Sequence, residues 1–361
     1  MAIKASGALS MQSDIVDEFG GTAPHAVSEY YRGGSNVPDV SGNNTIGTSG
    51  LIAFGNFYNC LNEILQALSN STNVDLSSIF GSDWTTSVPK RCTIAAGVTI
   101  GGTGGTAAIT VPSNMGGTLS IVITGSVIGT GGSAGGAGGD AISNAASGVT
   151  LIIESGGLCA GGGGGGGAGG AGGNGSYTSN NSSSQYNGGS YVWMTSPDSG
   201  GSMSRQKARW NGSYVRGSLY SYANTTSTSV TIGIYTYSRS SYVQVNYFPE
   251  ETIYYYYINQ SYTSTTNTTG GTGGAGGVGQ GYNQSSSSGS AGSSGGTNAG
   301  AGGTGGSGNT YGLAGSTGGT GANGNAGNGS AGAAGGAAGA ALSGTAVTFT
   351  NNGTVHGTVA T

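Results

Sequence analysis

The sequence predicts a mostly β and irregular chain that is built around glycine. Its 361 residues include 80 glycines and only 6% charged residues, and both values are far from the globular average. Short apolar segments that end in glycine recur along the chain, and glycine returns every third residue within the glycine runs. The expected parts are a small helical amino-terminal module, short β-solenoid-like repeats, a packed polyglycine II helix bundle and an inserted antiparallel β region.

Disorder and collagen are two other structures that glycine-rich chains adopt. Disordered chains combine high net charge with few aromatic residues, whereas this chain has a net charge of -4 and 20 tyrosines. A collagen triple helix requires a strict G-X-Y repeat with abundant proline, and this chain has six prolines, none of them in a glycine run. The composition therefore favours an ordered structure made of glycine.

Residues 1–90 carry three helix signals and half of the charged residues. Ser13 is placed to cap a first helix that Gly20 ends, and a second helix is expected in PHAVSEYYRGG between Pro24 and Gly33. The third is expected in CLNEILQALSN, whose apolar face consists of Leu61, Ile64, Leu65 and Leu68.

Residues 91–175 begin a repeat in which a β-type triplet is followed by a glycine turn and a second apolar residue. Four copies stand at 91–105, 120–132, 150–164 and 347–359. Because the first three are closely spaced, we expect them to stack as coils of one layer. The fourth copy lies at the end of residues 270–361, so the chain is expected to return to that layer.

The glycine runs are expected to be extended rods. Five runs, at 129–139, 161–175, 270–281, 300–308 and 318–339, share a glycine period of three. Polyproline II geometry has three residues per turn and no internal hydrogen bonds, so neighbouring rods must satisfy each other's backbone groups. Flexible linkers are the alternative. Within a bundle, the seven consecutive glycines after Cys159 and Ala160 are expected to form the most buried rod.

Residues 176–269 form an insertion of different composition, with fifteen of the twenty tyrosines and two of the three tryptophans. TSTSVTIGIYTYSRSSYVQVNYF alternates over two expected strands, with the hairpin turn at Ser238, Arg239 and Ser240. IYYYYINQSY adds a further expected strand.

The opening segment resembles an amino-terminal module of bacteriophage tail and tail-fibre proteins. The match is carried by SEYYRGG, which contains Tyr30, Tyr31, Arg32, Gly33 and Gly34. The remainder, with GGDAIS and ITGSVIGTGG, is similar to the glycine-rich adhesins at phage tail tips. This resemblance implies that the module attaches to other phage tail proteins, that polyglycine helices form a rigid sandwich, and that loops touch the bacterial surface.

Aromatic and basic residues of the insertion are the receptor-binding candidates, because tyrosine and tryptophan give large contact areas at low entropic cost. The candidates are Tyr191, Trp193, Arg209, Trp210, Tyr214, Tyr220, Tyr237, Arg239, Tyr242, Tyr254 and Tyr256. Half of the tyrosines are equally expected to form the core of the insertion. The basic residues near Trp210, which are Arg205, Lys207, Arg209 and Arg216, suit either an anionic lipopolysaccharide or a solvated loop.

Enzymatic, metal and cofactor functions are not expected. His25 and His356 are the only histidines and lie far apart in the sequence, so neither a metal triad nor a Ser-His-Asp set is evident. Cys60, Cys92 and Cys159 are expected to be buried reduced thiols. Nine scattered basic residues argue against nucleic acid as a partner, and no apolar segment is long enough to span a membrane or to serve as a signal peptide.

The expected function is that of a tail adhesin, made in the host cytoplasm and carried on the tail tip or tail fibre of the virion. It would bind a bacterial surface receptor, either an outer-membrane protein or lipopolysaccharide, and set the host range. A structural tail component without receptor contact is the alternative. An ice-binding polyglycine protein is a remote one, since it would need neither the SEYYRGG module nor the tyrosine-rich insertion.

Overall fold

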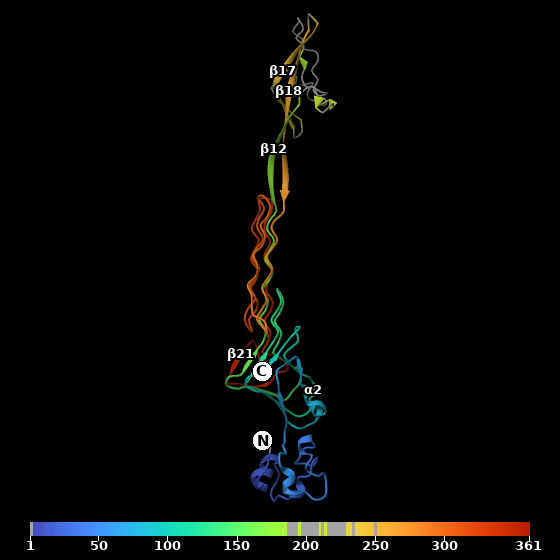
Figure 1. The fold of residues 1–361 in the computed structure, drawn as a ribbon, viewed down its shortest axis with the longest axis vertical. Coiled ribbons are helices and arrows are strands. Elements are labelled where there is room, and N and C mark those ends of the chain that lie inside the picture. The colour runs from blue at the N-terminus through green and yellow to red at the C-terminus, as the bar shows by residue number, and fades with distance from the viewer. Residues whose placement is uncertain are drawn as a thin grey trace. The chain divides into compact units, whose positions relative to one another are not determined.

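The computed structural model describes residues 3–185, 194–195, 209–210, 213–214, 229–232, 235–248 and 251–361, with the backbone alone from 183 to 260. The chain divides into two compact units, one formed by Met1–Asn174 with Thr269–Thr361 and the other by Gly175–Thr268 (Figure 1). The described residues are mostly β or irregular, with two short α-helices, α1 (Asp17–Phe19) and α2 (Leu76–Phe80). The predicted fold class is confirmed at this level.

Three parallel sheets form the centre of the first unit, and the chain visits them in the same order on each pass. The first sheet contains β1 (Ile64–Leu68), β4 (Lys90–Ile94), β7 (Leu119–Ile123), β10 (Val149–Ile153) and β20 (Thr348–Asn351). The second contains β2 (Ser71–Thr72), β5 (Thr99–Gly101), β8 (Ser126–Ile128), β11 (Leu158–Ala160) and β21 (Thr354–His356). The third contains β3 (Val74–Asp75), β6 (Ile109–Val111), β9 (Ile142–Asn144) and β19 (Leu342–Gly344). The chain therefore winds through stacked coils.

Alternating apolar side chains fill the inside of these coils. In β7 and β10 every second residue is buried, which places Leu119, Ile121 and Ile123 over Val149, Leu151 and Ile153. Successive side chains of a strand point to opposite faces, so the β-type triplets of the repeat direct their aliphatic residues inward. Phe349 pairs with Leu151, and the predicted return of the last repeat to the layer is confirmed.

The first coil lies where the sequence predicted a helix, and that prediction is wrong. Ile64–Leu68 forms β1, whose residues pair in parallel with Lys90–Ile94. The apolar spacing of this segment fits a helix face, but Ile64 and Leu68 also lie on the inner side of a strand. Pairing with β4 buries both and satisfies the backbone, and this tertiary pairing overrides the local helix preference. The chain thus has five passes through the first sheet, rather than the four repeats seen in the sequence.

The amino-terminal segment is less helical than predicted. The first helix is a π-helical turn, Met11–Val16, that continues into α1 and ends at Gly20, but its cap is Ser10 instead of Ser13. The second predicted helix is reduced to one 3₁₀ turn, Val27–Glu29, because the following residues make long-range contacts described below. Further 3₁₀ turns occur at Ser41–Asn43, Phe54–Phe57 and Gly81–Thr85.

Glycine runs leave the coils between the second and third sheets and hydrogen-bond to one another every third residue. The amides of Gly163, Gly166, Gly169 and Gly172 donate to the carbonyls of Gln280, Gly277, Gly274 and Gly271 at 2.8 Å. On a second side, the amides of Gly164, Gly167, Gly170 and Gly173 donate to Leu313, Ser316, Gly319 and Ala322 at 2.9 Å. A flexible linker would not form hydrogen bonds at regular intervals. The spacing of three residues between glycines is therefore also the spacing of the hydrogen bonds between runs.

Gly161–Gly167 is the central run, because each of its seven residues is buried. A Cβ built on any of them would lie closer than 3.0 Å to a carbonyl oxygen of another run. Side chains are therefore excluded on every side of this segment. The prediction that the seven-glycine run is the most buried rod is confirmed.

Serine side chains complete the bonding at the edge of the bundle. Ser287, Ser290 and Ser293 accept hydrogen bonds at their Oγ atoms from the amides of Val278, Ala275 and Thr272, at 3.0, 2.8 and 2.7 Å. An amide that faces away from the bundle needs a partner, which these hydroxyls supply at the same period of three.

The second unit is an antiparallel sheet. β12 (Gly175–Gln185) pairs with β18 (Glu251–Thr268), which pairs with β17 (Tyr235–Phe248), and β17 pairs with β16 (Ser229–Ile232). The strand predicted in IYYYYINQSY is confirmed as part of β18. The predicted turn at Ser238–Ser240 is wrong, because these residues lie inside β17. They adjoin a register shift between Arg239 and Tyr242, so the polar residues mark a β-bulge instead of a turn.

Lys90 is a charged residue buried in the second coil, at 2% exposure. Its Nζ donates to the carbonyl oxygens of Thr86, Val88 and Gly116 at 2.8 to 2.9 Å, and desolvation lowers the pKa of its ammonium group. We expect Lys90→Met to lower the free energy of unfolding by roughly 3 kcal/mol, because three carbonyls lose their donor. Arg91→Met, at the neighbouring exposed ion pair with Glu63, should cost less than about 1 kcal/mol. Urea denaturation of both variants measures the difference, and equal losses would contradict it.

Candidate functional site

Tyr30 of the SEYYRGG segment is a core residue of the amino-terminal module. Its side chain is fully buried, its hydroxyl donates to the Gly20 carbonyl at 2.6 Å, and its ring meets Phe57 edge to face at 6.3 Å. Burial raises the pKa of the Tyr30 hydroxyl. Tyr30 therefore holds the module together and does not form its outer surface.

Tyr31 and Arg32 join the loop that follows the motif to a later segment. The Tyr31 hydroxyl donates to the Gly50 carbonyl, and the Arg32 guanidinium donates from Nη1 to the Asn44 side chain. The Arg32 Nε atom lies 3.4 Å from an Asp39 carboxylate oxygen. These contacts join residues 31 and 32 to partners as far along the chain as Gly50. A helix brings together residues that are three or four positions apart, so these long-range contacts replace the predicted helix.

The backbone conformation at Gly33 and the close backbone contact at Gly34 both favour glycine. Gly33 has a φ of 77°, a conformation that other residues rarely adopt. A Cβ on Gly34 would lie 2.9 Å from the Tyr31 carbonyl oxygen. Beside this loop, Leu51 is 96% exposed and Phe54 39% exposed, so the module presents apolar side chains that the sequence analysis did not select.

The insertion candidates fall into three groups. Tyr191, Trp193 and Tyr220 lie outside the described residues, as do the basic residues Arg205, Lys207 and Arg216. Arg209, Trp210 and Tyr214 share a small antiparallel pair, β14 (Arg209–Trp210) with β15 (Ser213–Tyr214). The remaining candidates lie in β17 and β18.

The register of β17 and β18 brings the remaining five candidates to one face. Directly paired residues of antiparallel strands share a face, as do alternate residues of one strand. Tyr254 pairs with Gln244, Tyr256 with Tyr242, and Ile258 with Arg239. The next alternate pair on this face joins Tyr237 and Gln260. The bulge places one extra β17 residue between Arg239 and Tyr242, which keeps all five on the same side.

The opposite face of the hairpin is apolar at its turn end. Val245 pairs there with Ile253, and Val243 with Tyr255, which also pairs with Met194 of β13 (Met194–Thr195). An antiparallel sheet usually buries its more apolar face and leaves the other to solvent. Tyr242, Tyr254 and Tyr256 occupy the more polar face, beside Gln244. The alternation of the sequence predicted two faces. It gave no sign of the bulge that puts Arg239 and Tyr242 on the same face.

Two of the three thiols lie in the core of the coils and the third in the module. Cys60, Cys92 and Cys159 are free and buried, as predicted. Desolvation raises the pKa of Cys60 and raises the pKa of Cys92 and Cys159 to about 12. Thiols of this kind are poor nucleophiles at neutral pH. Among the described residues no cluster of three or more His, Cys, Asp or Glu residues is placed to hold a metal ion.

Comparison with protein-family models relates part of the chain to phage tail fibre proteins. Residues 62–234 match the family model of the phage tail fibre adhesin Gp38. This stretch is a Gp38 tail fibre adhesin region. The Gp38 match starts two residues before β1 and ends within the insertion, so it includes the first four coils and leaves out the SEYYRGG module. No curated protein sequence matches the chain.

One solved structure is similar to this chain, namely the crystal structure of the gp37-gp38 adhesin tip complex of the bacteriophage S16 long tail fibre. The similarity covers 95% of this chain and 90% of that one, at 16% identity and a TM-score of 0.39. At these values it transfers no residue, partner or receptor to the present chain. In the described part of the chain, no helix has the length and apolar character to cross a bilayer.

Proposed function

We propose that the chain is a receptor-binding adhesin of a phage tail fibre, and that its Gly175–Thr268 unit recognises a protein or lipopolysaccharide on the bacterial surface and sets the host range. The observation that carries this proposal is that the register of β17 and β18 places Tyr242, Tyr254 and Tyr256 on one face of the sheet, together with Gln244. The Gp38 adhesin family supports it, since an adhesin is by definition a binding protein.

Tyrosine suits recognition of a varied surface for physical reasons. It offers a large rigid ring with two side-chain torsions and a hydroxyl that donates or accepts a hydrogen bond. Sugars and protein loops both present mixtures of apolar and hydrogen-bonding groups. A face of tyrosine with glutamine, and with Arg239 as its charged member, offers apolar and hydrogen-bonding contacts to either of them.

The remaining regions have supporting roles in this proposal. Residues 91–175 and 270–361 form coils and polyglycine II rods that make a stiff scaffold, and residues 1–90 attach the protein to other tail proteins of the virion. The hydrogen bonds of period three support the polyglycine II assignment, because that helix has three residues per turn. No catalytic or cofactor role is assigned to any part of the chain.

Exchange of residues 176–269 between related phages tests the receptor assignment. We expect the host range to follow the exchanged segment, because the coils and rods of the scaffold stay the same. Plating on a panel of host strains measures this, and particle content of the adhesin serves as the control for assembly. If particles with normal content keep their original host range, the chain is a structural component and the receptor assignment is wrong.

Deletion of residues 1–60 tests the attachment role. We expect soluble protein that is missing from purified particles, because the core around Tyr30 and Phe57 is removed while the coils that start at Ile64 are kept. Immunoblotting of particles and of the cell extract measures both pools. Particles that still carry the shortened protein would contradict attachment through this module.

A further inference from the structure

The tyrosine face of β17 and β18 is elongated along the strands. Four consecutive rows of directly paired residues lie on it, namely Gln244 with Tyr254, Tyr242 with Tyr256, Arg239 with Ile258, and Tyr237 with Gln260. We call these four rows the tyrosine track. Residues on one face of a strand follow each other at about 6.8 Å, so the track extends over roughly 20 Å along β18. A ligand that uses all of it must itself be elongated.

Uncharged polar residues accompany the track on the other side of β18. The pairing of β18 with β13 and β12 places Thr195, Gln185 and Ser183 on the same face, beside the track. Together with Gln244 and Gln260 they supply hydroxyl and amide groups along its length. Hydroxyls and amides both donate and accept hydrogen bonds. The track therefore combines aromatic rings with neutral hydrogen-bonding groups of both kinds.

Arg239 is the single charged residue among the described positions of this face, which include no carboxylate. Charged ligands are recognised through complementary charges, which steer association and fix the register of binding. The phosphate groups of a lipopolysaccharide core would call for several basic residues, and the described face offers one. This charge balance favours an uncharged ligand.

A neutral sugar chain matches the track in shape as well as in charge. A sugar ring has an apolar C–H face, which packs on aromatic rings, and hydroxyl groups at its edge, which pair with amides and hydroxyls. A linear polysaccharide repeats both features along its length, as the track repeats tyrosine and glutamine. The core of a protein interface is more apolar than its rim, whereas Ile258 is the single aliphatic residue of the track.

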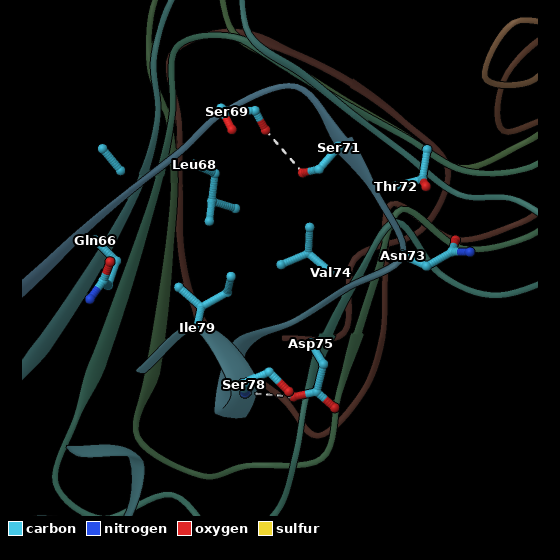
Figure 2. A pocket seen from close by; sticks show the side chains of 11 residues that line it. Gln66, Leu68, Ser69, Ser71, Thr72, Asn73, Val74, Asp75, Ser78 and Ile79 are labelled. Carbon is cyan, nitrogen blue, oxygen red and sulfur yellow. Dashed lines mark hydrogen bonds between the residues drawn. The ribbon is translucent and has the colours of Figure 1, made fainter. Parts of the chain in front are cut away.

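A cavity in the coils lacks these features (Figure 2). It has a volume of about 580 Å³ and lies at the open mouth of the first coil, where β1, β2 and β3 each stand at one end of a sheet. Leu68, Val74 and Ile79 surround it, and its lining contains no aromatic residue. A sugar ring would find no aromatic surface there, so the tyrosine track is the better site for a saccharide.

We infer that the tyrosine track binds the neutral polysaccharide chain of lipopolysaccharide, with the chain running along β17 and β18 across the rows of tyrosine and glutamine. The inference rests on the proposed function, in which the Gly175–Thr268 unit meets the bacterial surface. Of the two receptor classes proposed for that unit, protein and lipopolysaccharide, it selects the second and names the part of the molecule that is bound.

Competition with purified saccharide tests the receptor class on the unaltered protein. The probe is the polysaccharide released by mild acid from the lipopolysaccharide of a sensitive strain, freed of protein and lipid. At about ten times its dissociation constant, we expect it to lower the adsorption rate constant of phage particles roughly tenfold, because it occupies the site. The same material after periodate oxidation, which cleaves vicinal diols and opens sugar rings, should have no effect.

Treatment of the sensitive cells provides the second arm of this test. Protease treatment should leave adsorption unchanged, whereas periodate treatment should abolish it. A polysaccharide that does not compete, or adsorption that is lost after protease treatment, would overturn the inference.

Gln244→Leu separates a saccharide from a protein ligand, because it keeps the size of the side chain and removes its hydrogen-bonding groups. We expect the purified full-length variant to bind the released polysaccharide roughly tenfold more weakly, as for loss of a hydrogen-bonding partner to a polar ligand. Asn259→Leu is the matched control, since Asn259 pairs with Ser238 on the opposite face, and its affinity should be unchanged. Calorimetric titration measures both affinities.

Melting temperatures establish that both variants are folded. Unchanged affinity of a folded Gln244→Leu protein would overturn the inference, and if the variant does not fold, the competition experiment on the unaltered protein decides. The receptor assignment fails on a different result. If the host range follows exchanged residues 176–269 but the polysaccharide does not compete, the inference alone is wrong, whereas a host range that does not follow the segment contradicts the receptor assignment itself.

Discussion

Tyr242→Ser combined with Tyr256→Ser is expected to lower the adsorption rate constant of phage particles roughly 100-fold or more. The two residues pair directly across β17 and β18, so the double substitution removes two adjacent aromatic groups from one face. Aromatic anchors at the centre of an interface each contribute about 2 kcal/mol or more to binding, and 1.4 kcal/mol corresponds to about tenfold in affinity. Adsorption kinetics on sensitive cells measure the effect.

Tyr255→Ser is the matched control, because Tyr255 is the neighbour of Tyr256 on the apolar face, where it pairs with Val243 and Met194. It should lower the melting temperature of the protein, while particles whose adhesin is still folded adsorb normally. The double variant should show the opposite pattern, with its melting temperature kept. Normal adsorption of the double variant, or loss of adsorption for a fully stable Tyr255→Ser protein, would show that the faces are assigned the wrong way round.

Gly167→Ala is expected to lower the free energy of unfolding by about 3 kcal/mol or more. A Cβ at this position would meet the carbonyl oxygen of Ala333 at well under 3.0 Å, and that oxygen is fixed in the backbone of another run. The clash cannot be relieved by a side-chain rotation, so the runs must separate. Separation would weaken the bond from the Gly167 amide to the Ser316 carbonyl, and overpacking of a tight core alone costs about 1–3 kcal/mol.

Ala168→Ser is the control for this substitution. Ala168 follows Gly167 in the same run but is exposed, so an added hydroxyl meets solvent. Its free energy of unfolding should change by less than about 0.5 kcal/mol. Denaturant unfolding followed by circular dichroism compares the two variants, and similar losses at both positions would show that the runs are not closely packed.

The sequence predicted the repeating parts of this molecule because their physics is local and periodic. The glycine period of three reappears as bonds from Gly163, Gly166 and Gly169 to successive partners in another run. The aliphatic triplets became inward-facing strands, and the last repeat pairs with the layer as expected. Another run can approach only where no side chain stands in the way. The spacing of glycine along the sequence therefore fixes the positions at which runs come into contact.

The sequence was misleading where long-range contacts compete with local preference. Ile64 and Leu68 fit a helix face and a strand face equally well, and pairing with β4 decided for the strand. Tyr30 lies in a segment with good helix signals, but its burial against Phe57 left only a 3₁₀ turn before it.

The candidate binding face was only partly predictable. Composition placed the aromatic residues in the insertion, and alternation implied one buried and one open face. Which tyrosines share a face depends on the register of β17 with β18 and on the bulge between Arg239 and Tyr242, since one extra residue moves every later position to the other side.

The sequence by itself determined the materials of this protein, namely glycine runs of period three, repeated aliphatic triplets and a tyrosine-rich insertion, because composition and period are properties of each segment alone. The tertiary structure alone decided that the coils begin at Ile64, that Tyr30 is core, and that the first coil ends in an open aliphatic mouth. Those outcomes depend on pairing between segments far apart in the chain, and the energy of such pairing is not encoded in any one segment.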